Sequence, residues 1–199
     1  MSKLVQSGTL LGIKGIPVHV EVDLLRRLPS ITIVGLPDSA IRESADRVRS
    51  AIQQSGFEFP RKRVVINLAP AGLKKNGASF DLPIAIAILA AMNKIPEEAH
   101  QNALFVGELS LSGSIRPVQG VLSLALMAKK QGISRIFVPT ENASEASIVP
   151  GLEIFPVQDL KETIALCTQV TSSYIPTIES SKNQSLLDLG EVRGQGQCK

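Results

Sequence analysis

The stretch from Gly72 to Ser79 carries residue types that could serve two kinds of chemistry. It follows the phosphate-binding pattern G-x-x-x-x-G-K-[ST], except that Ala78 stands where a lysine would reach the phosphates. Alanine offers no ammonium group, and Lys74 and Lys75 lie elsewhere in the loop, so we expect a basic connecting loop and no ATP site. Ser79 is also a candidate nucleophile, but it needs a neighbouring base, and the sequence alone identifies none.

Other site chemistries lack the residues that they require. Cys167 and Cys198 stand far apart without Cys-x-x-Cys spacing, and the two histidines are His19 and His100. We therefore expect neither a metal site nor a disulfide framework. The chain has no tryptophan and one tyrosine, which disfavours nucleic-acid modules that stack bases on rows of aromatic side chains.

Positive charge is concentrated in the first part of the chain. Residues 1–75 contain twelve lysines and arginines against six acidic residues, whereas residues 76–199 contain nine against twelve, within a net charge of +3. This distribution indicates one basic face that could meet nucleic-acid phosphates or an acidic partner. The candidate contact residues are Arg42, Arg49, Arg61, Lys62, Arg63, Lys74 and Lys75.

The same cations have an ordinary alternative. Arg47 follows Glu43 by four residues and Arg49 follows Asp46 by three, spacings at which side chains pair along a helix. The remaining cations would then be solvated. Both interpretations stay open on the sequence alone.

Hydrophobic periodicity predicts strands and helices that alternate. Residues 18–24 show the period of two of a strand with one wet face, after a turn at residues 14–17. Asp38 or Ser39 can cap the first helix, and Asp81 is expected to cap the second, which is apolar nearly all round. The expected strands cover residues 5–13, 18–24, 30–34, 64–68, 104–109, 114–118, 135–138 and 153–157. The expected helices cover residues 41–52, 82–93, 120–131, a short stretch from 142, and 159–167.

These elements predict an α/β (α+β) fold, whose sheet is mixed because the chain starts with a hairpin. We expect one domain over residues 1–167. Residues 168–199 are rich in Ser, Thr, Gln and Gly and predict a linker or tail, because they offer little apolar surface to offset their ordering entropy. The sequence shows no signal peptide and no membrane span, so we expect a cytoplasmic protein.

Three stretches resemble the protease domain of Lon. They are G-E-L-S-L-S-G-S-I-R-P-V-Q-G at 107–120, V-P-T-E-N at 138–142, and K-N-G-A-S at 75–79, which corresponds to the nucleophile loop. The resemblance implies a mixed-sheet two-layer sandwich of the Lon protease C-terminal domain type, also described as ribosomal protein S5 domain 2-like. It also implies that Ser79 stands at the position of the catalytic serine.

The resemblance breaks at the catalytic base. In Lon the catalytic lysine follows a glycine by four positions, and here Leu124 stands four positions after Gly120. A leucine cannot accept a proton from Ser79. Lys129 and Lys130 come more than a turn later on the expected helix. The likeness is therefore one of fold, and a Lon-like serine peptidase would require another base near Ser79.

Longer motifs within residues 4–167 resemble the ComM-type family, also called YifB, of magnesium-chelatase-like AAA+ proteins. They are T-I-V-G-L-P-D at 32–38, E-S-A-D-R-V-R-S-A-I at 43–52, S-G-F-E-F-P at 55–60, I-N-L-A-P-A at 66–71 and D-L-P-I-A-I-A at 81–87. The stretch D-L-G-E-V-R-G-Q at 188–195 is similar to the start of the AAA+ module in that family.

This second resemblance implies a non-catalytic N-terminal domain whose tail leads to an AAA+ module that these 199 residues do not include. Members of the family are similar to hexameric DNA helicases that use ATP and magnesium during recombination in natural transformation. We therefore expect this domain to help assemble the ring and to contact DNA without sequence preference. A pure oligomerisation or interaction module is the alternative, and no membrane partner is expected.

Overall fold

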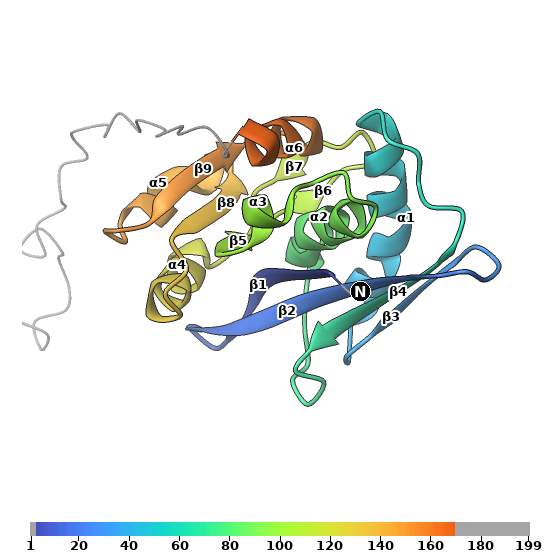
Figure 1. Ribbon diagram of the computed structural model, residues 1–199. Helices are drawn as coiled ribbons and strands as arrows, with labels where there is room; N and C mark the ends of the chain where they lie inside the picture. The colour runs from blue at the N-terminus through green and yellow to red at the C-terminus, as the bar shows by residue number, and fades with distance from the viewer. Residues whose placement is uncertain (1–2, 170–199) are drawn as a thin grey trace, which may run out of the picture.

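The structure, a computed structural model, describes residues 3–169 of the chain. Its centre is a seven-stranded mixed sheet with the strand order β3-β4-β2-β1-β5-β8-β9 (Figure 1). The strands are β1 (Lys3–Leu11), β2 (Lys14–Leu25), β3 (Ser30–Val34), β4 (Arg63–Ala69), β5 (Ala103–Phe105), β8 (Arg135–Pro139) and β9 (Glu153–Val157). A separate ribbon pairs β6 (Glu108–Leu109) with β7 (Ile115–Arg116).

Six helices and two short 3-10 turns surround the sheet within the described residues. The helices are α1 (Ser39–Gln54), α2 (Asp81–Ala91), α3 (Glu97–His100), α4 (Val121–Lys130), α5 (Ala143–Ser147) and α6 (Leu160–Gln169). The 3-10 turns are η1 (Ala78–Phe80) and η2 (Thr140–Asn142).

Strand direction decides which loops meet. β2 runs antiparallel to both of its neighbours, β1 and β4, whereas every other neighbouring pair in the sheet is parallel. The six strands other than β2 therefore point the same way, and their carboxyl ends meet at one edge of the sheet. We call this the C-terminal edge, and we call the opposite one, where these strands begin, the N-terminal edge.

The half of the sheet formed by β1 to β4 carries α1 and α2 on one face, and α4 covers its other face only at the β1–β2 hairpin, beside Gly8 and Gly15. Val18, Val20 and Val22 of β2 are completely buried, with α2 packed on β1 and β2 and α1 packed on α2. The residues between these valines point away from the helices, as the period of a strand requires. The alternation predicted for residues 18–24 is therefore confirmed.

The half formed by β5, β8 and β9 is covered on both faces. Phe105, Phe137 and Phe155 stack across these strands with ring centroids 4.6 and 4.7 Å apart, within the same core as α1, α2 and α6. The intervening residues, such as Ile136, pack in a second core with α4 and α5. The α/β class and the mixed sheet predicted from the sequence are confirmed. The sequence predicted two layers, one of sheet and one of helices. The structure adds a third layer, made of α4 and α5, on the other face of the sheet (Figure 1).

Two of the predicted boundaries that were wrong change the path of the chain. The β1–β2 turn lies at Gly12 and Ile13 rather than at residues 14–17, because Gly12 adopts the positive φ of 62° that the tight turn needs. The strand predicted over 104–109 is split after Phe105. Gly107 leaves the sheet there and its N–H donates to the Ser79 carbonyl over 3.1 Å.

The last described helix, α6, runs from Leu160 to Gln169, two residues past the predicted end of the domain at 167. The remaining predicted linker, residues 170–199, lies outside the described residues. No helix among residues 3–169 is long and apolar enough to cross a membrane.

His100 gives the fold a predictable pH dependence. Its side chain is 3% exposed, and burial lowers its pKa from the ordinary value of 6.5 although Glu97 acts in the opposite direction. Below about pH 6.5 the unfolded chain binds a proton at His100 that the folded chain resists, so the contribution of His100 to the free energy of unfolding should fall as the pH drops.

Urea unfolding between about pH 5 and pH 8 measures this effect. His100→Leu should lose this part of the pH dependence, whereas the matched change His19→Leu at an exposed histidine should retain it. Identical pH profiles for wild type and His100→Leu would contradict the prediction.

Candidate functional site

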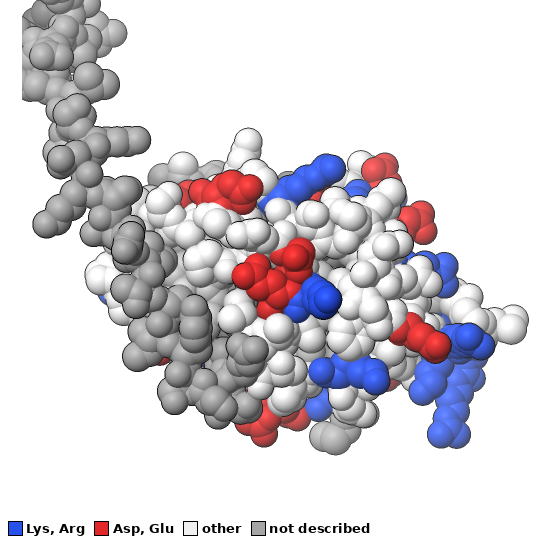
Figure 2. All heavy atoms as spheres, turned by 90° about the horizontal axis from the view of Figure 1, so that it is seen from above, with Lys and Arg blue, Asp and Glu red and all other residues white. Residues whose placement is uncertain are grey.

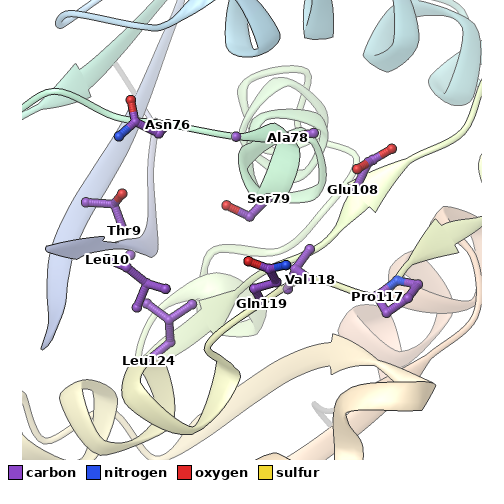
Figure 3. Close-up of a pocket in the computed structure, with 12 residues that line it drawn as sticks. Thr9, Leu10, Asn76, Ala78, Ser79, Glu108, Pro117, Val118, Gln119 and Leu124 are labelled. Carbon is purple, nitrogen blue, oxygen red and sulfur yellow. The ribbon is translucent and has the colours of Figure 1, made fainter. Parts of the chain in front are cut away.

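A cavity of about 510 Å³ opens at the C-terminal edge of the sheet. Its walls come from the end of β1, the loop before η1, the start of β6, the segment before α4, and α4 itself. Figure 3 shows Ser79 near the middle of the cavity, with Thr9 and Asn76 on one side, Glu108 on the other, and Leu124 reaching in from α4. Residues far apart in the sequence therefore converge on Ser79.

The break between β5 and β6 holds Ser79 in place. The Ser79 carbonyl accepts a hydrogen bond from Gly107 N–H, and the Gly107 carbonyl accepts one from Leu82 N–H over 3.0 Å. Gly107 approaches closely, since a Cβ added there would come within 2.8 Å of the Ile115 side chain. The chain thus leaves the sheet at Gly107 to fix the backbone just before α2.

The cavity contains no basic side chain. Leu124 lines it and is 2% exposed, and the single titratable residue among the lining residues is Glu108. Glu108 accepts a hydrogen bond from Arg116 over 3.2 Å. Among the described residues, none is hydrogen-bonded to the Ser79 hydroxyl, and the lysine that the resemblance to Lon leads one to expect is replaced in the cavity wall by Leu124.

Lys75 is a structural residue, and the structure contradicts its assignment to a DNA-contacting surface. Its side chain is 0% exposed, and its ammonium group donates to the Pro70 carbonyl and, over 2.8 Å, to the Gly35 carbonyl. Burial lowers its pKa. Lys75 therefore joins the loop after β3 to the loop after β4. The Ser79 hydroxyl is not among the hydrogen-bond partners of the Lys75 ammonium group.

Asp38 reinforces the same junction. It caps α1 as predicted, because one carboxylate oxygen accepts from Ile41 N–H over 2.9 Å. The other oxygen accepts from Gly77 N–H, also over 2.9 Å. The cap of α1 thereby positions the glycine that comes two residues before Ser79.

The prediction that Asp81 caps α2 was wrong. Asp81 lies within the first turn of α2, fully buried, and its two oxygens accept from Arg47 over 2.8 and 3.1 Å. Leu109 N–H also donates to it over 3.2 Å. Burial raises the Asp81 pKa to about 6, with Arg47 opposing the rise. The expected pairing of Arg47 with Glu43 is therefore replaced by an ion pair between α1 and α2.

The remaining predicted cations fall into two groups. Arg42 and Lys74 are exposed near the start of α1, at the C-terminal edge. Arg61, Lys62 and Arg63 lie at the start of β4, on the opposite edge. The seven residues of β4 separate these edges by about 20 Å, at about 3.3 Å per residue. The candidate contacts therefore do not form one continuous patch.

Arg49 belongs with the second group. Its guanidinium lies 5.0 Å from the centre of the Phe59 ring, just before β4 begins, and no ion pair with Asp46 forms. The predicted pairing of Arg49 with Asp46 was therefore wrong. A cation–π contact leaves the guanidinium at the surface with its charge available.

Sequence reasoning missed two arginines of this group. β4 pairs Arg63 with Leu25 at the end of β2 and with Ser30 at the start of β3, so the exposed turn carrying Arg26 and Arg27 lies beside the start of β4. We call Arg26, Arg27, Arg61, Lys62 and Arg63 the basic tip. Figure 2 shows a group of blue side chains at this end of the molecule. Within residues 3–168, none of the five forms an ion pair.

The fold and the Ser79 cavity define a Lon-like domain. The chain is 29% identical over 147 residues to the Lon protease of Rhizobium meliloti, a match that covers 68% of this chain and 18% of that protease. Residues 20–142 match the family described as subunit ChlI of Mg-chelatase. The chain therefore belongs to the magnesium-chelatase-like AAA+ family that includes ComM and YifB, and it corresponds to the N-terminal domain.

Individual relatives support the same assignment. The chain is 39% identical over 197 residues to YifB of Escherichia coli and 37% identical over 205 residues to competence protein ComM of Haemophilus influenzae, with 98% of this chain covered in each match. An uncharacterized protein of Mycobacterium tuberculosis is 40% identical over 190 residues. The chain spans 38% to 40% of the length of these relatives.

Replacing Lys75 tests its structural role. Lys75→Met should lower the free energy of unfolding by about 3 kcal/mol, because the Gly35 and Pro70 carbonyls lose their buried donor. Lys74→Met removes the same charge from the adjacent exposed position and should change stability by less than about 0.5 kcal/mol. Urea unfolding of both variants measures the difference, and equal effects would refute the role assigned to Lys75.

The missing base at Ser79 predicts chemical inertness. A fluorophosphonate probe should leave Ser79 unlabelled at neutral pH, because no described side chain is placed to take the hydroxyl proton. Intact-mass spectrometry of wild type and Ser79→Ala measures the outcome. Labelling that occurs in wild type and disappears in Ser79→Ala would instead establish a serine hydrolase with another base.

Proposed function

We propose that this chain is the non-catalytic N-terminal domain of a ComM-type DNA helicase, acting in recombination and natural transformation. In this proposal the domain helps to assemble the ring and contacts DNA without sequence preference. ATP and magnesium would be bound by the AAA+ module of the full-length protein. The similarity to competence protein ComM supports the choice of natural transformation as the process.

The observation that supports the DNA contact is the basic tip. It brings five cations from two separate stretches of sequence to one end of the sheet, where all but the half-buried Arg63 are exposed. Cations that have no acidic partner in the protein can replace the counterions of a phosphate backbone, which gives binding that ignores sequence and weakens with salt. A helicase that moves along DNA needs contacts of this kind.

The domain offers few means of reading bases. The described residues contain no tyrosine or tryptophan, and the three stacked phenylalanines are buried in the core. Of the other three phenylalanines, Phe59 and Phe80 are buried and Phe57 is half-buried against the core. The part of the chain that the structure describes therefore presents no row of exposed aromatic rings for stacking single-stranded bases. Contacts with the phosphate backbone remain the mode that suits this surface.

Charge reversal at the two edges of the sheet tests the DNA contact. The double change Arg27→Glu with Lys62→Glu should weaken binding to duplex DNA at low salt. It should also reduce the slope of log K against log salt concentration by about 2, since each lost phosphate contact accounts for about 0.9. Fluorescence anisotropy with a labelled duplex over a range of salt concentrations measures both quantities.

The matched control is the double change Arg42→Glu with Lys74→Glu, which reverses two exposed cations at the C-terminal edge. It should leave both the affinity and the slope nearly unchanged. An equal loss in the control would show that net charge, rather than the basic tip, governs binding. Absence of binding by wild type at low salt would refute the DNA contact.

A further inference from the structure

β3 forms an unprotected edge of the sheet. It pairs with β4 alone among the described strands, so the backbone groups along its other side have no strand partner. Its five residues, Ser-Ile-Thr-Ile-Val, include no charge and no proline. Natural sheets normally block an open edge with such residues, because an unblocked edge pairs with further strands.

The opposite edge of the same sheet does carry these protections. β9 begins with Glu153, which is exposed, and contains Pro156, whose nitrogen cannot donate to a ladder. The contrast within one molecule shows that the open edge at β3 is not a general property of this sheet. It singles out β3 as the strand available for pairing.

Apolar side chains line the β3 edge beyond what the monomer can bury. Ile31 and Ile33 pack against the main core but stay only partly buried where the sheet ends. Leu28, before β3, is 87% exposed, and Leu36, after it, is 57% exposed. Both ends of the strand therefore present an apolar residue to the surroundings.

Leu36 is also held in an unfavourable backbone conformation. Its φ is +58°, a region that leucine rarely occupies. Lys75 N–H donates to the Leu36 carbonyl over 3.3 Å, next to the buried contact of the Lys75 ammonium with Gly35. The junction at Lys75 thus fixes an exposed leucine in place at the end of the edge.

We propose that β3 pairs with β3 of a second copy of this chain, antiparallel and centred on Thr32. In this register Ile31 of each copy lies opposite Ile33 of the other, on the face that carries the helices. β-Branched pairs of this kind stabilise antiparallel strands. Thr32 lies opposite Thr32 on the other face, and Ser30 lies opposite Val34.

The five residues of β3 are nearly symmetric about Thr32, which suits pairing with a second copy of the same strand. The exposed Leu28 and Leu36 extend the apolar edge beyond the two ends of the strand. The two basic tips lie at opposite ends of the pair, which avoids repulsion between them.

This contact has a two-fold axis and closes after two copies. It deepens the self-association included in the proposed function, and it identifies the surface that would be used. Within a larger ring it would join subunits in pairs or stack one ring on another. It leaves the basic tip of each copy free.

Cysteine cross-linking tests the register in the full 199-residue chain. Opposite residues in an antiparallel pair have Cα atoms about 4.5 to 5.5 Å apart, within reach of a disulfide. With Cys198→Ser as the background, Thr32→Cys should form a covalent dimer on mild oxidation. Val34→Cys in the same background should not, because the two copies of residue 34 lie far apart in this register.

A charge exchange tests whether the edge holds the pair together. Thr32→Lys should shift the chain to monomer in size-exclusion chromatography with light scattering, because two lysines would face each other across the axis. Mixing Thr32→Lys with Thr32→Glu should restore the dimer. Gln6→Lys, on the same face but in a central strand, should leave the mass unchanged.

The outcomes separate this inference from the wider proposal. Dimers that survive Thr32→Lys, or that fail to cross-link through Thr32→Cys, would overturn the β3 contact while leaving self-association intact. A wild-type chain that stays monomeric at high concentration would overturn both the contact and the self-association of this domain. DNA binding by the basic tip is measured separately and depends on neither result.

Discussion

The arrangement of the site depends on one buried ammonium group. Lys75 has no contact with solvent, and its amine donates to carbonyls of Gly35 and Pro70 in two different loops. A charge buried in this way is tolerated only when its hydrogen bonds are satisfied, so the two loops must stay together. Asp38 adds a second link by capping α1 and accepting from Gly77. The Ser79 loop, the start of α1 and the exposed Leu36 are therefore held by the same junction.

The sheet separates two regions of different character. All strands but β2 end at the same edge, and there the loops enclose the cavity around Ser79. The reversed direction of β2 places the β2–β3 turn at the other edge, beside the start of β4, where the unpaired cations gather. A single antiparallel strand in an otherwise parallel sheet thus keeps a cavity without basic side chains apart from a basic tip.

Ser79, which the resemblance to Lon aligns with the nucleophile, lies in a cavity whose lining contains no lysine. Leu124 is used for packing, since a Cβ added at Gly8 would come within 2.8 Å of the Leu124 side chain. Position 124 therefore seals α4 against β1, and no side chain there can accept a proton. The backbone around Ser79 is held by hydrogen bonds from the backbone N–H groups of Gly107 and Leu82. Its conformation therefore does not depend on a catalytic side chain.

The sequence by itself determined the order of strands and helices, the cap at Asp38 and the burial of α2, because periodicity and capping are local properties. Motif spacing likewise showed that Leu124 stands where the resemblance to Lon places the lysine that would act on Ser79. It also indicated the family through long motifs.

The sequence could not show that Lys74 is exposed and Lys75 buried, since adjacent residues in a loop have no period that predicts burial. Nor could it foresee the partner of Arg47, because Asp81 reaches it only through the packing of α1 on α2. The basic tip was likewise decided by tertiary structure: Arg26 and Arg27 lie far from Arg61 in the chain, and the register of β2, β3 and β4 alone brings them together.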